Sequence, residues 1–254
     1  MRKIILALAG SIVLFACNKD KDKDGIFKSE EVQVLGGKSW TWVRLDNEGN
    51  PQQVGITLND AVLNSVPTGT TEGGDHTMEN TFIIPFHQKG TKATPFQFVM
   101  LNWNPNGHEP AGIYDLPHFD IHFYMTPADS VMKYTDADKI DNNLPAAAYL
   151  PPTYQAPIPG VPMKGKHWID VTSPELNGQP FTQTFIYGSY DSKVVFYEPM
   201  ITLDFLKNNS NYERSIPQPA KFGKAGFYPT KMRVVKHDGV TEIVLDEFVQ
   251  RQAC

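Results

Sequence analysis

The chain has 254 residues, with 23 Lys and Arg against 28 Asp and Glu, and a formal net charge of −5. This acidic balance, without any basic run or any helix loaded with Lys or Arg, argues against a nucleic-acid partner. Aromatic residues make up 11% of the chain. They supply enough bulk for a hydrophobic core, and the length suits one domain of the larger all-β kind.

The first residues have the pattern of a targeting segment. Arg2 and Lys3 precede an apolar run over residues 4–15, which is too short to span a bilayer as a stable helix. The run ends in Leu-Phe-Ala-Cys at residues 14–17, which looks like the lipobox of a lipoprotein signal. We therefore expect residues 1–16 to be removed and Cys17 to be lipidated as the mature N-terminus. The alternative is an ordinary signal peptide with a chance Cys.

A charged segment follows Cys17. Lys and Asp alternate up to Asp24 with no apolar residue among them. Such a segment cannot bury surface, so residues 17–30 are expected to be a flexible tether. Asn18 is not the Asp that retains lipoproteins at the inner membrane in the best-known sorting rule, which favours the outer membrane. The sequence does not indicate which face of that membrane the protein would occupy. Without Arg2 and Lys3 the charged residues number 21 basic against 28 acidic, a net charge of −7.

The chain contains two cysteines, Cys17 and Cys254. If Cys17 carries lipid, Cys254 has no partner within the chain, and a disulfide framework is excluded. The stability of the remaining domain, residues 31–254, must then come from a hydrophobic core.

Turn residues punctuate the first half of this domain. Long helical periodicity is nearly absent, which is typical of an all-β fold. Strands are expected over residues 32–35, 39–45, 53–58, 81–86 and 96–103. A short helix is expected over residues 60–65 with Asn59 as N-cap, as the only convincing helix before residue 125, and a second over 127–133 with Thr126 as N-cap.

The second half continues the same pattern. Two hairpins are expected, with turns at residues 190–193 and 237–239. Residues 205–218 are expected to be a polar loop. The Pro-rich segment 139–162 is expected to be a lid or arm over the sheet, or an oligomer contact; a domain boundary is the weaker alternative, since neither side looks complete alone. The fold class is thus all-β: one antiparallel sandwich or flattened barrel with long loops and one or two short helices. The remaining expected strands cover residues 166–171, 181–190, 193–203, 226–236 and 240–248.

The stretch over residues 117–125 carries the densest chemistry. It alternates strictly, so that one face of a strand presents polar side chains and the other apolar ones. The apolar face is made by Phe119, Ile121 and Phe123, and the other by His118, Asp120, His122 and Tyr124.

Imidazole and carboxylate side chains on one face suit zinc, iron or manganese. Residues two apart on a strand lie about 6.6 Å apart, and residues four apart about 13 Å. A single ion can therefore be shared by His118 and Asp120, but not easily by His118 and His122. Either two of the three side chains bind and the third supports them, or the strand bends. The alternative is a set of polar residues that lie on a wet sheet face or pair across strands.

Further ligands must come from elsewhere in the chain. His167 begins one expected strand, and Glu198 lies late in another on the face of Phe196. A buried Glu needs a partner, which a metal or a His would supply; an ordinary salt bridge is the alternative for both residues. His108 and Glu109 lie on the loop that leads into the central strand and could approach the site, although a solvated loop is the simpler expectation.

Other catalytic motifs are missing from the sequence. It has no Gly-x-Ser-x-Gly elbow, no phosphate-binding loop and no Gly-x-Gly-x-x-Gly. The His-x-Asp at residues 118–120, with a distant His167, loosely matches the layout of jelly-roll non-haem iron oxygenases.

Several motifs together resemble a known family. They are Gly-His-Glu-Pro at residues 107–110, Gly-Ile-Tyr-Asp at 112–115, Pro-His-Phe-Asp at 117–120, Lys-His-Trp-Ile-Asp at 166–170 and Phe-Tyr-Glu-Pro-Met-Ile-Thr at 196–202. The run is similar to an uncharacterised family of secreted β-rich proteins, typified by a thermophile protein under sigma/anti-sigma control. The resemblance covers roughly residues 35–250. It implies an exported β domain that can form a homo-oligomer. It implies no established activity.

Two functions are consistent with these observations. The first is an exported lipoprotein in which His118, Asp120, His122, His167 and Glu198 converge on a divalent metal. Whether it is an enzyme stays open; a hydrolase or oxygenase would use the metal to activate water or oxygen, with Tyr124 or Glu198 transferring protons. The second is a non-enzymatic binding or structural lipoprotein of the envelope that forms homo-oligomers. The sequence identifies no small-molecule ligand.

Overall fold

The computed structural model describes residues 25–67 and 80–254. The expected signal peptide, Cys17 and most of the expected tether lie outside these ranges. Every described strand, helix and core residue lies after residue 24. A chain that begins at Gly25 therefore keeps all the described contacts of the core. No helix in the described ranges is long and apolar enough to cross a bilayer.

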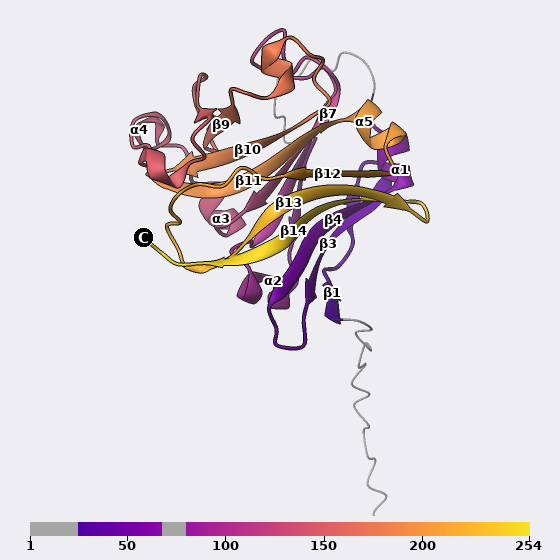
Figure 1. The fold of residues 1–254 in the computed structure, drawn as a ribbon. Helices are drawn as coiled ribbons and strands as arrows, with labels where there is room; N and C mark the ends of the chain where they lie inside the picture. The colour runs from indigo at the N-terminus through magenta and orange to yellow at the C-terminus, as the bar shows by residue number, and fades with distance from the viewer. Residues whose placement is uncertain (1–24, 68–79) are drawn as a thin grey trace, which may run out of the picture.

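The described strands form two antiparallel sheets that lie face to face (Figure 1). Of the two expected arrangements, the sandwich is found. The first sheet has the order β1-β3-β4-β14-β13-β12, with β2 paired to β3, and the second the order β5-β6-β7-β11-β10-β9-β8. The strands of the first sheet are β1 (Ile26–Lys28), β2 (Val32–Val34), β3 (Gly37–Leu45), β4 (Pro51–Asn59), β12 (Asn211–Ser215), β13 (Gly226–His237) and β14 (Val240–Arg251). Those of the second are β5 (Thr81–Pro85), β6 (Phe98–Asn104), β7 (His118–Tyr124), β8 (Tyr154–Gln155), β9 (Lys166–Asp170), β10 (Gln183–Tyr190) and β11 (Lys193–Thr202).

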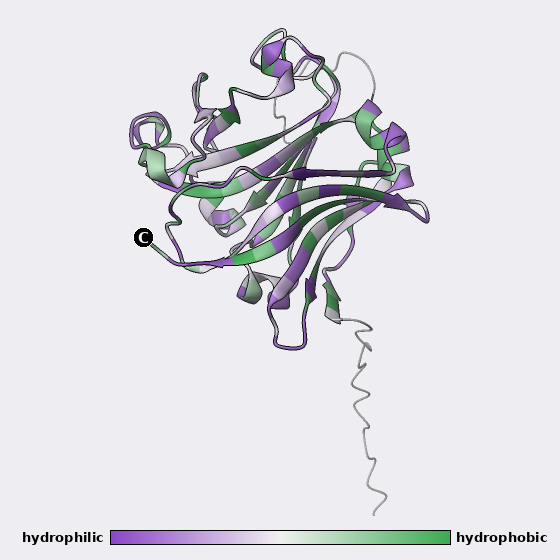
Figure 2. Ribbon diagram, viewed as in Figure 1, coloured by the Kyte–Doolittle hydropathy of each residue, from purple (hydrophilic) through white to green (hydrophobic). Residues whose placement is uncertain are grey.

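The main core lies between the sheets. β4 contributes Ile56 and β14 contributes Ile243 from the first sheet, and β7 contributes Phe119, Ile121 and Phe123 from the second. Apolar and polar positions alternate along β13 and β14, as expected for strands with one buried face (Figure 2). The expected burial of the apolar face of β7 is confirmed.

The opposite face of the second sheet is also covered. Two smaller apolar clusters lie on it, one around Tyr124 and Phe196 and the other around Tyr114 and Met200. All seven residues of β7 are buried. The wet sheet face is therefore wrong, because the polar side chains of β7 lie in the interior beneath loops. The other alternative, pairing across strands, is not contradicted, since His122 of β7 lies beside Glu198 of β11.

The short helices differ from the expectation in number and in one cap. The helix α1 (Asp60–Asn64) is capped by Asn59, as expected. The helix α3 (Ala128–Val131) starts after Pro127, and the Thr126 hydroxyl contacts Tyr134 instead of capping it. The helix α2 (Gln88–Ala93) was not expected, since a short segment with Gly90 inside has no amphipathic pattern. Five α-helices are described in place of one or two.

Two segments expected to lack structure contain regular elements. Residues 205–218 include part of α5 (Leu203–Asn208) and the strand β12, which was missed because an edge strand with one partner needs little apolar pattern. The strand β1 lies within the expected tether, where it pairs with β3. The first sheet therefore includes residues before residue 31.

The Pro-rich segment packs against the sandwich. It holds the end of α4 (Ala137–Asp141), the 3₁₀ helix η3 (Ala147–Tyr149) and the strand β8. Leu150 and Tyr154 belong to the main core, and the Tyr154 hydroxyl donates to the carbonyl of Phe185 at 2.7 Å. The segment is thus part of the same domain as the sheets.

Candidate metal centre

The strand β7 holds the central position in the second sheet, between β6 and β11. Asp120 lies opposite Asn102 of β6 and Met200 of β11, and His122 lies opposite Met100. The residues of β11 before and after Glu198 pair with β7 in a register that places Glu198 across from His122. The polar face of β7 therefore meets a carboxylate of the neighbouring strand at the middle of the sheet.

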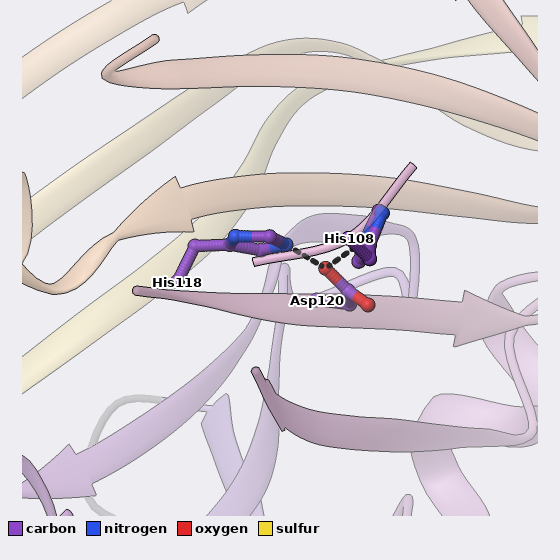
Figure 3. Close-up of side chains that lie close together, drawn as sticks. All are labelled: His108, His118 and Asp120. Atoms are coloured by element: carbon purple, nitrogen blue, oxygen red, sulfur yellow. Dashed lines mark hydrogen bonds and ion pairs between the residues drawn. The ribbon is translucent and has the colours of Figure 1, made fainter. Parts of the chain in front are cut away.

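The first group of metal-ligating side chains is His108, His118 and Asp120, which we call the first triad. His108 reaches β7 because its backbone N–H donates to the carbonyl of Tyr114 at 3.1 Å, which folds the loop back on itself. The Nε2 atoms of His108 and His118 lie 3.4 and 3.0 Å from the same atom, Oδ1 of Asp120. Figure 3 shows both rings directed at this oxygen.

The backbone fixes the orientation of both imidazoles. Nδ1 of His108 lies 2.7 Å from the carbonyl oxygen of Glu109, and Nδ1 of His118 lies 2.7 Å from that of Leu116. A carbonyl oxygen only accepts, so we assign the ring hydrogen to Nδ1 in each case. In the neutral rings, both Nε2 lone pairs then face a carboxylate oxygen. Three acceptors in this arrangement require a cation between them, either a proton or a metal ion.

Charge within the first triad shifts two pKa values. Burial lowers the pKa of His108, but the attraction of Asp120 outweighs it and raises this pKa to about 9. Burial raises the pKa of Asp120, and the neighbouring His108 and His118 more than reverse this, so that it falls well below its usual range. A proton on His108 thus serves as the cation when no metal is bound.

The second triad consists of His122, His167 and Glu198, from three different strands. Nε2 of His122 lies 3.3 Å from Oε1 of Glu198, and Nε2 of His167 lies 3.5 Å from Oε2. Glu198 is 1% exposed, and its Oε2 makes no hydrogen bond with the described residues. The carboxylate is therefore held between two imidazoles with one oxygen lacking a donor.

Burial controls the protonation of the second triad. Burial, followed by the nearby charge of Lys164, lowers the pKa of His167 to about 3, which keeps this imidazole neutral. Burial, and then the negative charge of Asp120, raises the pKa of Glu198 well above its usual range. His167 is thus available as a neutral ligand, whereas Glu198 needs a nearby cation to ionise.

The spacing of the ligand atoms fits a bound ion. In each triad one nitrogen or oxygen from every side chain lies within 4.8 Å of the others. Tetrahedral ligands about 2.1 Å from a zinc ion lie about 3.4 Å from each other. The four measured imidazole–carboxylate separations are 3.0, 3.4, 3.3 and 3.5 Å. Each triad could therefore hold a metal ion.

The five residues expected to converge on one ion lie in two groups. His118 and Asp120 belong to the first triad, and His122, His167 and Glu198 to the second. The spacing argument explains the separation, because His118 and His122 are too far apart along one strand to share an ion. Neither expected alternative is found: His122 does not support the first group, but belongs to a group of its own.

Two residues of the site were not among the predicted ligands. For His108 the solvated loop was preferred over an approach to the site, but its side chain is only 11% exposed; its place directly before the central strand was the available signal. Lys164 is 4% exposed, and its Nζ donates to Oδ1 of Asn102 at 3.1 Å. It stands among Pro, Gly and Lys near the end of a Pro-rich segment, which is no signal for burial.

Tyr124 has a packing role in the structure. Its hydroxyl donates to the carbonyl of Lys164 at 3.1 Å, and its ring stacks on Phe98. Burial raises the pKa of Tyr124 well above its usual range. The structure thus gives no support to Tyr124 as a proton-transfer group.

A pocket of about 290 Å³ opens beside the triads. One histidine of each triad lines it, His108 from the first and His167 from the second, together with Glu109. The remaining lining residues are mainly apolar, and Ile158, Pro159 and Val161 come from the Pro-rich segment. That segment therefore forms one wall of a pocket that leads to both triads.

Comparisons with protein-family models, curated proteins and solved structures found no match to this chain. The resemblance to the secreted β-rich family therefore stays an expectation from the sequence motifs.

Proposed function

We propose that the protein is a lipid-anchored metalloprotein of the cell envelope that binds one divalent ion in each triad. The first triad carries the proposal: two imidazoles, each oriented by a backbone carbonyl, direct Nε2 at one oxygen of Asp120. The orienting bond of each ring is typical of histidines that ligate metals. The second triad offers a matching set of two histidines and one carboxylate.

Two histidines and one carboxylate leave coordination positions free. Such sites bind water, oxygen or a substrate group in the open positions, as in metal-dependent hydrolases and non-haem iron oxygenases. The pocket beside His108 and His167 supplies the space for a substrate. We therefore propose hydrolysis or oxygenation of a small, largely apolar molecule, with zinc, iron or manganese as the metal.

Metal content is the direct test. The chain from Gly25 onward should be purified, loaded with zinc, iron or manganese in turn and analysed by elemental mass spectrometry. We expect two ions per chain for the wild type, one each for His118→Ala and His122→Ala, and none for the double variant. His237→Ala, an exposed histidine outside both triads, is the control and should retain two.

Loss of folding is separated from loss of ligands by two isosteric variants. Asp120→Asn and Glu198→Gln keep the shape of each triad but remove its negative charge, so each should lose one ion while the circular dichroism spectrum is unchanged. Equal, near-zero metal in the wild type and the double variant would refute the proposal.

A non-enzymatic role is the second candidate, and Lys164 favours it. The charge of this buried cation offsets part of the rise in the pKa of Glu198, and a proton on His108 balances Asp120. The polar cluster could thus be a scaffold without metal, in an envelope protein that acts by binding or by forming homo-oligomers.

The oligomeric state tests this second candidate on the intact chain. Deletion of the Pro-rich segment is unsuitable, because it would remove Leu150 and Tyr154 from the core. Light scattering coupled to gel filtration should show a discrete assembly over a range of concentrations. A monomer at every concentration would count against assembly.

A further inference from the structure

A second and larger pocket lies away from both triads. Its volume is about 610 Å³, and residues of both sheets line it together with Cys254. Tyr187 and Tyr197 line it from the second sheet, and Tyr228 from the first. The volume falls within the range of about 300–1,000 Å³ that is typical of small-molecule sites.

The interior of this pocket is mainly apolar. The hydroxyl of Tyr187 donates to the carbonyl of Pro217 at 2.6 Å, and that of Tyr228 to the carbonyl of Lys224 at 2.9 Å. These hydroxyl hydrogens are already used, so a ligand would meet chiefly rings and aliphatic groups. The aliphatic and aromatic lining includes Met125, Leu144, Val194, Val195 and Phe222.

The charged side chains of the pocket all have one sign. Lys193, Lys221 and Lys224 line it, and no Asp or Glu side chain does. All three lysines are exposed, and none forms an ion pair within the described ranges. This bias is notable in a chain with a net charge of −5. An apolar interior with a cationic rim is complementary to a molecule with an apolar tail and an anionic head.

We propose that this pocket binds a single-chain amphiphile with a carboxylate head, such as a fatty acid. The alkyl chain enters between the sheets and contacts the tyrosine rings, while the carboxylate remains at the rim near the lysines. The pocket shares no lining residue with the pocket beside the triads. This inference is therefore independent of the metal site, and either can fail without the other.

Calorimetric titration of the chain from Gly25 onward tests the proposal, with each ligand below its critical micelle concentration. Octanoate, decanoate and dodecanoate should bind with an affinity that rises about fourfold per methylene group. Dodecanol and dodecyltrimethylammonium, with the same tail and no anionic head, should bind at least about tenfold more weakly than dodecanoate. Absence of dodecanoate binding, or equal affinity for dodecanoate and dodecanol, would overturn the proposal.

Variants locate the binding in this pocket. Combined Lys193→Gln, Lys221→Gln and Lys224→Gln should weaken dodecanoate binding about tenfold, and Lys221→Glu with Lys224→Glu should weaken it further. These side chains are exposed, so the fold should be retained. The matched control changes three exposed lysines outside the pocket, Lys92→Gln, Lys133→Gln and Lys207→Gln, and should leave the affinity unchanged. An equal loss in both triple variants would show that only the net charge acts, and would exclude the pocket as the site.

Discussion

His108 acquires its role from the loop that carries it. The carbonyl of Glu109 orients the ring, and Asp120 holds a proton on it when no metal is present. The side chain is largely buried but still lines the pocket beside the triads. One residue thus connects the buried polar side chains of β7 to the pocket in which we propose that a substrate binds.

The raised pKa of His108 predicts a pH dependence of stability for the metal-free protein. The unfolded pKa is about 6.5 and the folded one about 9, so the stabilisation is complete below pH 6.5 and is lost as the pH rises towards 9. Urea unfolding in the presence of a chelator should show that His108→Gln is destabilised relative to wild type at pH 6.5. The difference should shrink at pH 9; a difference that stays constant would contradict the assignment.

At the scale of the elements, β7, β11 and β9 supply the second triad around Phe196, and β10 lies between β11 and β9. Gly188 of β10 lies opposite Phe196 of β11 on one side and His167 of β9 on the other. The ring of Phe196 contacts His122 and His167, with centroids 4.9 and 5.2 Å away. The missing side chain at Gly188 is what allows the ring to lie there, because an added Cβ would come within 1.9 Å of it.

Gly188→Ala should therefore disturb the second triad. Displacement of the Phe196 ring in a packed interior is expected to cost about 1–3 kcal/mol of unfolding free energy. The metal content should fall from two ions per chain to one, because the second triad loses its ion while the first triad retains its ion. Gly223→Ala is the control, since a Cβ there meets nothing within 4 Å. Equal stability of the two variants in urea would refute this role of Gly188.

At the scale of the whole molecule, every described strand of the sandwich lies after residue 24. The strand β1 begins at Ile26, directly after the charged segment that we expect to be a tether. The sheets cover the main core on one face of β7, and the loops cover the ligands on the other. The proposed anchor and the proposed binding sites therefore lie in separate parts of the chain.

The proposed anchor predicts the effect of Cys17→Ser. The variant should move from the membrane fraction to the soluble fraction or remain unprocessed, and mass spectrometry of the N-terminal peptide should show no lipid. Cys254→Ser is the control, because Cys254 is exposed and free, and it should stay with the membrane. A lipid-free wild-type N-terminus would show that the lipobox pattern is misleading.

The sequence by itself determined the features that depend on local periodicity. The alternation over residues 118–124 was sufficient to separate Phe119, Ile121 and Phe123 from the ligand face, because successive strand residues point to opposite sides. The same spacing showed that His118 and His122 cannot easily share an ion. Only the tertiary structure decided which other side chains lie beside His118 and which lie beside His122. His108, Lys164 and Glu198 reach β7 through loop folding and strand register, which depend on contacts between distant segments.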